Sequence, residues 1–303
     1  MLRLKISRSL SLLALCVLAA NLPAHAKTVA PKKPVMPDIK SASVLVLDTA
    51  SSTVLLSRRP DEAVPIASIT KLMTALVVLE AGQPMNEMLA ITADDQRATL
   101  GNRSHLAVGT RLTRAEMMHL ALMASENRAA NALGRSYPGG VPALAKAMNA
   151  KAAALGMNHS HFVEPTGLSS QNVASPQDLT RLVNAAAQQP AMRHYSTDPK
   201  FSIRSGKQEV QFVNTNLLVR NPGWDITLQK TGYISEGGKC LVMKTTIQGR
   251  DVVIVLLDSV GKYTRIADAR RIRSWMESTS AWRNTIAQSQ NRAVGTSVST
   301  RSQ

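Results

Sequence analysis

Residues 65–74 have the sequence PIASITKLMT, in which Ser68 stands three residues before Lys71. Leu72 and Leu76 continue at helical spacing, which predicts that the serine lies at or near a helix N-terminus. Side chains three residues apart share one helix face, so the hydroxyl and the amine would lie together. The helix dipole would favour negative charge near the serine, and burial would favour the neutral lysine. The pair is therefore a candidate nucleophile with its own base.

The same spacing recurs at Ser259 and Lys262, so the spacing alone is a weak signal. This second copy follows the apolar run 252–257, which predicts a strand, and Gly261 between the two residues disfavours a helical turn. We therefore interpret the second copy as structural.

Two further short motifs follow the first copy and make it more specific. The tripeptide SEN at residues 125–127 follows an apolar run, and KTG at residues 230–232 precedes a strand-like segment. Ser-x-Asn also occurs from Ser170 and from Ser289, whereas Lys-Ser/Thr-Gly occurs once. The combination of three motifs in one order is more informative than any of them alone.

The order of these motifs resembles that of the serine penicillin-recognising enzymes, which carry S-x-x-K, S-x-N and K-T-G. Longer strings, ALMASENRAA at 121–130 and FVEPTGL at 162–168, are similar to those of the D-alanyl-D-alanine peptidases. With YPGG at 137–140 and GKYT at 261–264, they most closely resemble the endopeptidases of the penicillin-binding protein 7 type. The resemblance covers residues 41–283.

The pattern of apolar residues predicts an α/β fold. Strands are predicted early and late, and helices in between; the strands are at 43–48, 54–57, 209–213, 227–232, 238–246 and 252–257. Thr113 with Glu116, and Ser175 before Pro176, are predicted helix starts, and a last amphipathic helix begins near Tyr263. This order implies an antiparallel sheet flanked by helices with an inserted all-helical subdomain, as the resemblance to β-lactamases and transpeptidases also implies.

The termini suggest export. Residues 1–26 combine three cations, an apolar core at 10–20 and a small-residue cleavage site, which indicate a signal peptide. The apolar core is shorter than the roughly 20 residues of a membrane span. We predict a flexible leader at 27–40, a catalytic domain at 41–283 with its helical subdomain at about 90–190, and a disordered tail at 284–303. Export would place the enzyme in the periplasm, where Cys240 would be its only cysteine.

The formal net charge of +16, or +13 without the signal peptide, favours anionic partners. Export and an aromatic content of 3% argue against nucleic acid, so envelope polymers and, at most peripherally, lipid headgroups are expected. The arginines from Arg265 to Arg283 are interpreted chiefly as the solvated face of the last helix, with a dedicated binding patch as the alternative. No cofactor or metal is expected, because His159 and His161 lack a third ligand in the sequence pattern.

The resemblance implies the catalytic roles. Ser68 would attack a D-alanyl carbonyl to form an acyl-enzyme, and Lys71 would act as base, with its pKa lowered by burial and by the charge of Lys230. Ser125 would relay a proton to the leaving amine.

The binding roles follow in the same way. Asn127 would hydrogen-bond the substrate amide or order Lys71. Lys230 and Thr231 would bind polar groups of the substrate, and the backbone amides of Ser68 and Tyr233 would hold the oxyanion. No metal ligand is assigned.

The implied activity is hydrolysis of D-Ala–meso-diaminopimelate cross-links in peptidoglycan by a serine DD-endopeptidase that β-lactams inhibit. A D-alanyl-D-alanine carboxypeptidase is the nearest alternative, and a β-lactamase or a non-catalytic cell-wall binding protein are others. Glu164 is expected to order its loop, so that β-lactam adducts would deacylate slowly. The two peptidase activities differ in the size of the leaving group that the site must accommodate. The motifs give no information on that space, so they do not distinguish an endopeptidase from a carboxypeptidase.

Overall fold

A computed structural model describes residues 36–205 and 208–278 of the chain. The predicted signal peptide, most of the predicted leader and the predicted tail lie outside these residues. The sequence-based assignment of those segments therefore stays a prediction.

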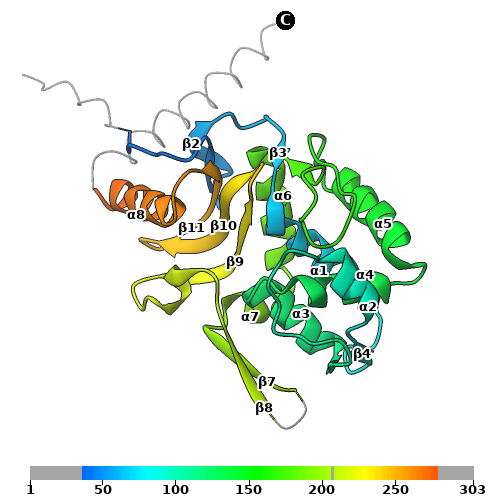
Figure 1. Cartoon of the computed structure of the whole chain (residues 1–303). Coiled ribbons are helices and arrows are strands. Elements are labelled where there is room, and N and C mark those ends of the chain that lie inside the picture. The colour runs from blue at the N-terminus through cyan, green and yellow to red at the C-terminus, as the bar shows by residue number, and fades with distance from the viewer. Residues whose placement is uncertain (1–35, 206–207, 279–303) are drawn as a thin grey trace, which may run out of the picture. The chain divides into compact units, whose positions relative to one another are not determined.

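A five-stranded antiparallel sheet forms the centre of the described chain (Figure 1). Its strand order is β2-β1-β11-β10-β9, with the bounds Thr53–Arg58, Ser43–Asp48, Arg250–Ser259, Gly238–Ile247 and Asp225–Ile234. The first strands of the chain pair with the last, and Ser43 lies opposite Leu257. The predicted sheet, in which the two ends of the domain meet, is confirmed.

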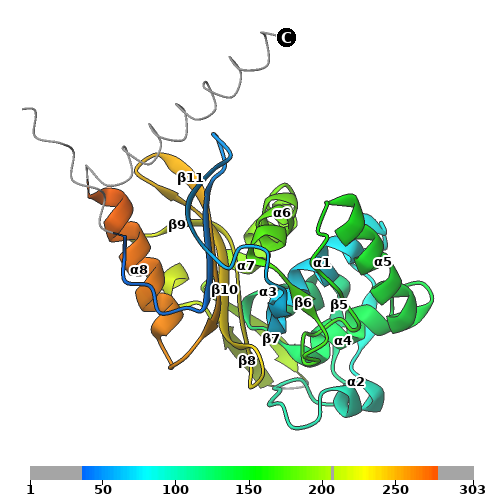
Figure 2. The same cartoon turned by 90° about the horizontal axis from the view of Figure 1, so that it is seen from above.

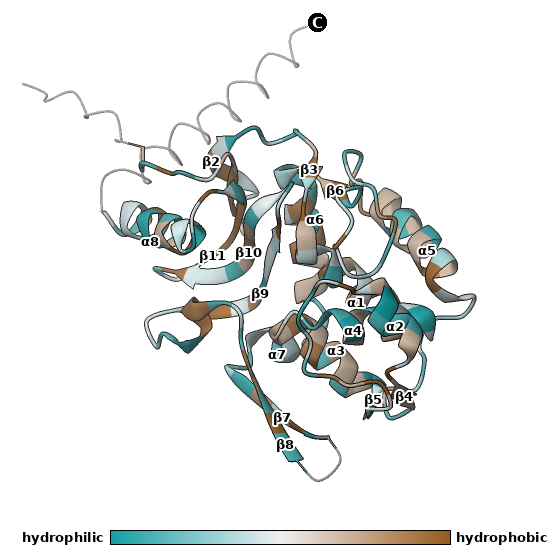
Figure 3. Cartoon of the chain, viewed as in Figure 1, coloured by the Kyte–Doolittle hydropathy of each residue, from teal (hydrophilic) through white to brown (hydrophobic). Residues whose placement is uncertain are grey.

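Both faces of this sheet are buried, because apolar residues occupy both alternating sets of positions in the inner strands. In β11, Val253 and Val255 belong to the core on the helical side, whereas Ile254 and Leu256 belong to the core beneath α8 (Thr264–Glu277). Figure 2 shows α8 on one side of the sheet and the remaining helices on the other. In Figure 3, much of α8 is hydrophilic, whereas α6 carries hydrophobic residues beside the sheet.

The helical side consists of seven helices, among the described residues, with two short two-stranded sheets. The helices are α1 Thr70–Glu80, α2 Ala93–Ala98, α3 Arg114–Met123, α4 Asn127–Arg135, α5 Gly140–Ala154, α6 Pro176–Ala187 and α7 Pro190–Thr197. The short sheets pair β3 (Val64–Pro65) with β6 (Val173–Ala174), and β4 (Met88–Ala90) with β5 (Arg111–Thr113).

The helix starts that the sequence predicts are present. Thr113 and Glu116 form a reciprocal capping box at α3, and the Ser175 side chain accepts a hydrogen bond from the Asp178 amide at α6. These local signals are reliable because each satisfies backbone amides that the helix itself leaves free.

One predicted strand has a different partner from the one expected. The segment at 209–213 is part of β8 (Gln208–Val213), which pairs with β7 (Lys200–Ser205) in a separate hairpin (Figure 1). Strand β7 is not among the strands predicted from the sequence. Ile203 and Phe212 are buried, while most other positions of the hairpin are more exposed. The two strands can therefore be stable outside the main sheet.

The arrangement leaves β9 at the edge of the main sheet, beside the short 3-10 turn η1 (Ala67–Ile69) that precedes α1. No helix within residues 36–205 and 208–278 is long and apolar enough to cross a membrane.

Candidate active site

Ser68 lies in η1, immediately before α1, so the predicted position at a helix start is confirmed. Its neighbour Ala67 has a φ of 50°, and Ser125 in the second motif has a φ of 60°. Such left-handed conformations of non-glycine residues cost about 1–3 kcal/mol each and persist only where the surroundings impose them. Two of the three motifs therefore carry backbone strain where they approach the site.

Lys71 is 1% exposed and touches the serine. Its Nζ lies 2.8 Å from Ser68 Oγ, 2.8 Å from Asn127 Oδ1 and 2.5 Å from Thr166 O. An ammonium has three donors, and these contacts use all of them. A neutral amine would keep two donors for Asn127 and Thr166 and turn its lone pair toward the serine hydroxyl.

Burial lowers the pKa of Lys71 to about 7, against the opposing charges of Glu164 and Glu126. Burial also lowers the pKa of Lys230 well below its usual value, and the neighbouring Lys71 and Arg265 lower it further. From the sequence, the charge of Lys230 is expected to share in lowering the pKa of Lys71. The structure instead assigns that shift to burial, and the charge effect falls on Lys230.

The motifs meet in a pocket of about 250 Å³ between β9, the 125–127 loop and η1. Its lining includes the predicted residues Ser68, Ser125, Asn127, Thr231 and Tyr233. Lys71 reaches this group through its hydrogen bonds, whereas Lys230 is fully buried and donates from Nζ to Thr231 O at 2.8 Å. The structure therefore brings the predicted residues together, with the two lysines beneath the pocket surface.

Glycines allow the backbone around Ser68 to pack this closely. A Cβ on Gly167, whose φ is +80°, would lie 1.9 Å from Ala67 O, and a Cβ on Gly232 would lie 2.9 Å from Ile66 O. Each of these contacts joins a motif segment to the backbone of the nucleophile turn.

Replacing Gly167 with alanine is expected to disrupt the site. The new methyl group would displace either the Thr166 carbonyl from Lys71 or the Ala67–Ser68 backbone, so penicillin acylation should fall by at least about tenfold, with an unfolding cost above the 1–2 kcal/mol of the left-handed strain itself. Gly249→Ala is the matched control, because its φ is +73° and nothing lies within 4 Å of the added Cβ. Acylation rates and thermal unfolding of both variants check this, and equal losses would contradict it.

Glu164 orders the loop that holds Gly167. Its carboxylate accepts hydrogen bonds from the Thr166 and Gly167 amides, both at 2.6 Å, and from Asn172 Nδ2 at 2.8 Å. The predicted loop-ordering role is confirmed. These bonds fix the Thr166 carbonyl that contacts Lys71.

Arg265 is a pocket residue that the sequence analysis assigned to a solvated helix face. That interpretation is wrong for this arginine, because its side chain is half-buried at the start of α8 and lines the pocket with Thr231. Its Nε and Nη1 are buried and have no hydrogen-bond partner within the described part of the chain. A buried cation with unused donors is suited to an anionic ligand.

The second serine–lysine pair is structural, as predicted. Ser259 is 1% exposed, and its Oγ lies 2.7 Å from Ser41 Oγ, which in turn donates to Asp268 at 2.7 Å. Lys262 is exposed and lies over the Tyr263 ring instead.

Two other residues considered from the sequence are packed in the interior. Cys240 is fully buried, and burial raises the pKa of its thiol to about 11. His119 is 4% exposed, with its Nε2 2.9 Å from a carboxylate oxygen of Asp198.

Comparison with known proteins agrees with this geometry. Residues 27–261 match the model of a peptidase family described as D-alanyl-D-alanine carboxypeptidase. A D-alanyl-D-alanine endopeptidase of Pseudomonas aeruginosa is 49% identical over 80% of this chain and 79% of its own length. Another D-alanyl-D-alanine endopeptidase, from Escherichia coli, is 44% identical over 84% and 83% of the two chains.

Solved structures show the same fold. A mutant of a Streptomyces DD-transpeptidase superposes with a TM-score of 0.74 at 26% identity, covering 79% of this chain and 98% of its own. A D-alanyl-D-alanine carboxypeptidase of Mycobacterium tuberculosis gives 0.71 at 26% identity, covering 80% and 93%. Fold and site together define a serine peptidase of the penicillin-recognising class. The chain belongs to the D-alanyl-D-alanine carboxypeptidase family of peptidases, and the resemblance found in the sequence is confirmed.

Proposed function

We propose that the chain is a periplasmic DD-endopeptidase that hydrolyses D-Ala–meso-diaminopimelate cross-links of peptidoglycan through an acyl-enzyme on Ser68. The observation that carries this proposal is the 2.8 Å contact between Lys71 Nζ and Ser68 Oγ inside a buried, fully hydrogen-bonded arrangement. The name D-alanyl-D-alanine endopeptidase of the relatives at 49% and 44% identity supports the choice of substrate.

In the acylation step, neutral Lys71 accepts the proton of the Ser68 hydroxyl as Oγ attacks the D-alanyl carbonyl carbon. The backbone amides of Ser68 and Tyr233 hold the developing oxyanion, and loss of one such donor would cost about 2.7–4 kcal/mol of barrier. The C–N bond then breaks, and the proton passes through Ser125 to the leaving amine. Asn127 keeps Lys71 in place by accepting its hydrogen bond at 2.8 Å.

Substrate binding uses the free edge of β9, along which an extended peptide can add as a further strand. The leaving residue of a cross-link carries a free carboxylate next to the amine released. Arg265 and Thr231 would bind that carboxylate, with the buried Lys230 side chain held against the Thr231 carbonyl beneath them. Binding of the carboxylate would give hydrogen-bond partners to Nε and Nη1 of Arg265.

Deacylation requires water to attack the acyl carbon, with Lys71 again as base. Glu164 does not serve this step, because its carboxylate is bound to the amides of its own loop. β-Lactams would therefore acylate Ser68 and remain attached. Slow deacylation would distinguish the chain from a β-lactamase, and the complete set of motifs favours catalysis over a non-catalytic binding role.

The location and partners follow from the sequence. We infer that residues 1–26 are a cleaved signal peptide, and that the positive charge holds the enzyme near the anionic sacculus, with at most peripheral membrane contact. A carboxypeptidase that removes terminal D-alanine is the second candidate. Its support is the description of the family itself and a D-alanyl-D-alanine carboxypeptidase of Mycobacterium tuberculosis at 32% identity.

Digestion of purified sacculi tests the proposal. The enzyme is expected to convert dimeric to monomeric muropeptides, and to release little D-alanine from a monomeric pentapeptide, as measured by chromatography of the products. High salt should slow the digestion because it screens attraction to the polymer. Release of terminal D-alanine with the dimers left intact would make the chain a carboxypeptidase.

A further inference from the structure

A second cavity, of about 630 Å³, opens beside the active-site pocket. We call it the side cavity, and the residues that matter here are Asp94 and Ala98 of α2, Asn131 and Arg135 of α4, Val141 of α5, and Leu168. Leu168 also lines the active-site pocket, so one side chain forms a wall of both. The volume lies within the range of about 300–1,000 Å³ that is usual for small-ligand sites.

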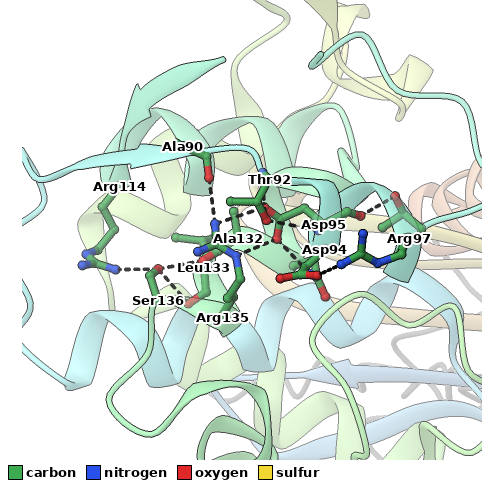
Figure 4. A network of polar contacts seen from close by, with 12 residues as sticks. Ala90, Thr92, Asp94, Asp95, Arg97, Arg114, Ala132, Leu133, Arg135 and Ser136 are labelled. Carbon is green, nitrogen blue, oxygen red and sulfur yellow. Dashed lines mark hydrogen bonds and ion pairs between the residues drawn. The ribbon is translucent and has the colours of Figure 1, made fainter. Parts of the chain in front are cut away.

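Arg135 presents a fixed cation to the side cavity. Its Nε and Nη2 bind the buried carboxylate of Asp95 at 3.1 and 3.0 Å, and Nη2 also donates to Ala90 O at 2.7 Å (Figure 4). Asp95 is itself fixed by the capping box of α2 and by Asn131 at 2.9 Å. The guanidinium is thus oriented, yet a third of the side chain is exposed and Nη1 has no hydrogen-bond partner in the described part of the chain.

A carboxylate accompanies this cation. Asp94 lines the same cavity with 64% of its side chain exposed, and its one ion-pair partner among the described residues is Arg97 on the surface of α2 (Figure 4). Glu164 lines the cavity too, but its carboxylate accepts hydrogen bonds from the amides of its own loop. A cavity lined by a guanidinium, an exposed carboxylate and apolar residues suits a ligand that carries an amine and a carboxylate on an aliphatic chain.

The position of the cavity relative to Ser68 indicates which part of a substrate would enter it. Arg265, which would bind the leaving carboxylate, comes from α8, on the face of the sheet opposite the helical layer (Figure 2). Leu168 comes from the helical side of the pocket. A peptide with its scissile carbonyl at Ser68 and its leaving group toward Arg265 therefore directs its acyl-donor stem toward Leu168 and the side cavity.

We propose that the side cavity binds the free amino-acid end of the diaminopimelyl residue in the acyl-donor stem. That residue precedes the D-alanine attacked by Ser68, and its side chain ends in one amine and one carboxylate. Arg135 would bind the carboxylate and Asp94 the amine, while Val141 and Leu168 contact the methylene chain. This assignment rests on the proposed function, and it makes Arg135 and Asp94 determinants of stem specificity.

Competition with labelled penicillin tests this without requiring turnover. The probes are the tetrapeptide L-Ala-γ-D-Glu-meso-diaminopimelyl-D-Ala and its counterpart with L-lysine, which lacks the terminal carboxylate. For the unmodified enzyme, the diaminopimelyl peptide is expected to slow labelling at about tenfold lower concentration than the lysine peptide, as one charge-assisted hydrogen bond allows. Equal potency of the two peptides would overturn the proposal.

A variant that fills the side cavity provides a second test of the proposal. Ala98→Trp adds an indole at an exposed helix position, and it should remove the preference while the rate of penicillin acylation without peptide stays within about twofold. Ala150→Trp is the matched control, since Ala150 is an exposed helical alanine that lines neither cavity. A preference that survives Ala98→Trp would also overturn the proposal. Absence of dimer cleavage in sacculi would instead contradict the endopeptidase activity and leave the competition result standing.

Discussion

Ser68→Ala is expected to abolish the covalent penicillin adduct, whereas Ser259→Ala should retain it. Ser68 lies in the turn before α1 with Lys71 Nζ at 2.8 Å, while Ser259 is buried against Ser41 and has no lysine amine bound to its hydroxyl among the described residues. Without the hydroxyl, no acyl-enzyme can form, so labelling measured by denaturing electrophoresis should fall by more than about 10³-fold.

The two serine variants are also expected to differ in thermal stability. Ser68→Ala should unfold at nearly the same temperature as the unmodified chain, because the neutral amine of Lys71 keeps its hydrogen bonds to Asn127 and Thr166. Ser259→Ala removes a partner of Ser41 and should cost about 1 kcal/mol of stability. Adduct that survives in Ser68→Ala and disappears in Ser259→Ala would reverse the assignment of the nucleophile.

The acylation rate is expected to rise with pH through about 7. Burial lowers the pKa of Lys71 to about 7, so the ammonium dominates below that pH and the neutral amine above it. Only the neutral amine can accept the serine proton, so the rate should fall by about tenfold per pH unit on the acidic side and level off toward pH 9. Penicillin acylation between pH 5 and 9 measures this.

Lys71→Arg tests whether Lys71 acts as a proton acceptor or only as a positive charge. A guanidinium stays protonated, so acylation should drop by about 10²–10⁴-fold and lose its rise near pH 7. Lys146→Arg on the exposed face of α5 is the control and should leave the profile unchanged. An unchanged rate in Lys71→Arg would rule out a neutral lysine as base.

The sequence predicted those parts of the site that depend on local spacing. Ser68 and Lys71 share a turn, and the tripeptides at 125–127 and 230–232 carry their own signals, so order along the chain was enough to group them. Helix starts at Thr113 and Ser175 were predictable for the same reason, since a cap acts within three residues.

Features that depend on long-range packing were not predictable. Arg265 belongs to a helix whose periodicity correctly places Ile266 and Ile272 against the sheet, but periodicity does not show that the first turn reaches the pocket. β8 was predicted as a strand, but β7 and its pairing with β8 were not, because neither segment alone indicates which strand it will pair with. Burial was predicted as a cause of the lowered pKa of Lys71, but the sequence did not show that the charge effect between the two lysines lowers the pKa of Lys230 instead.

The placement of β11 between β1 and β10 has a consequence for biogenesis. Ser43 pairs with Leu257, which is more than 200 residues later in the chain. Strand β1 can therefore pair with β11 only after nearly the whole domain has been synthesised. Such distant pairing is a high contact order, and it slows folding. A polypeptide interrupted before residue 250 would leave the strand edges of β1 and β10 uncovered, favouring aggregation or proteolysis over partial activity. Hydrolytic competence should consequently appear only late in folding, after β11 has paired with both of its neighbours.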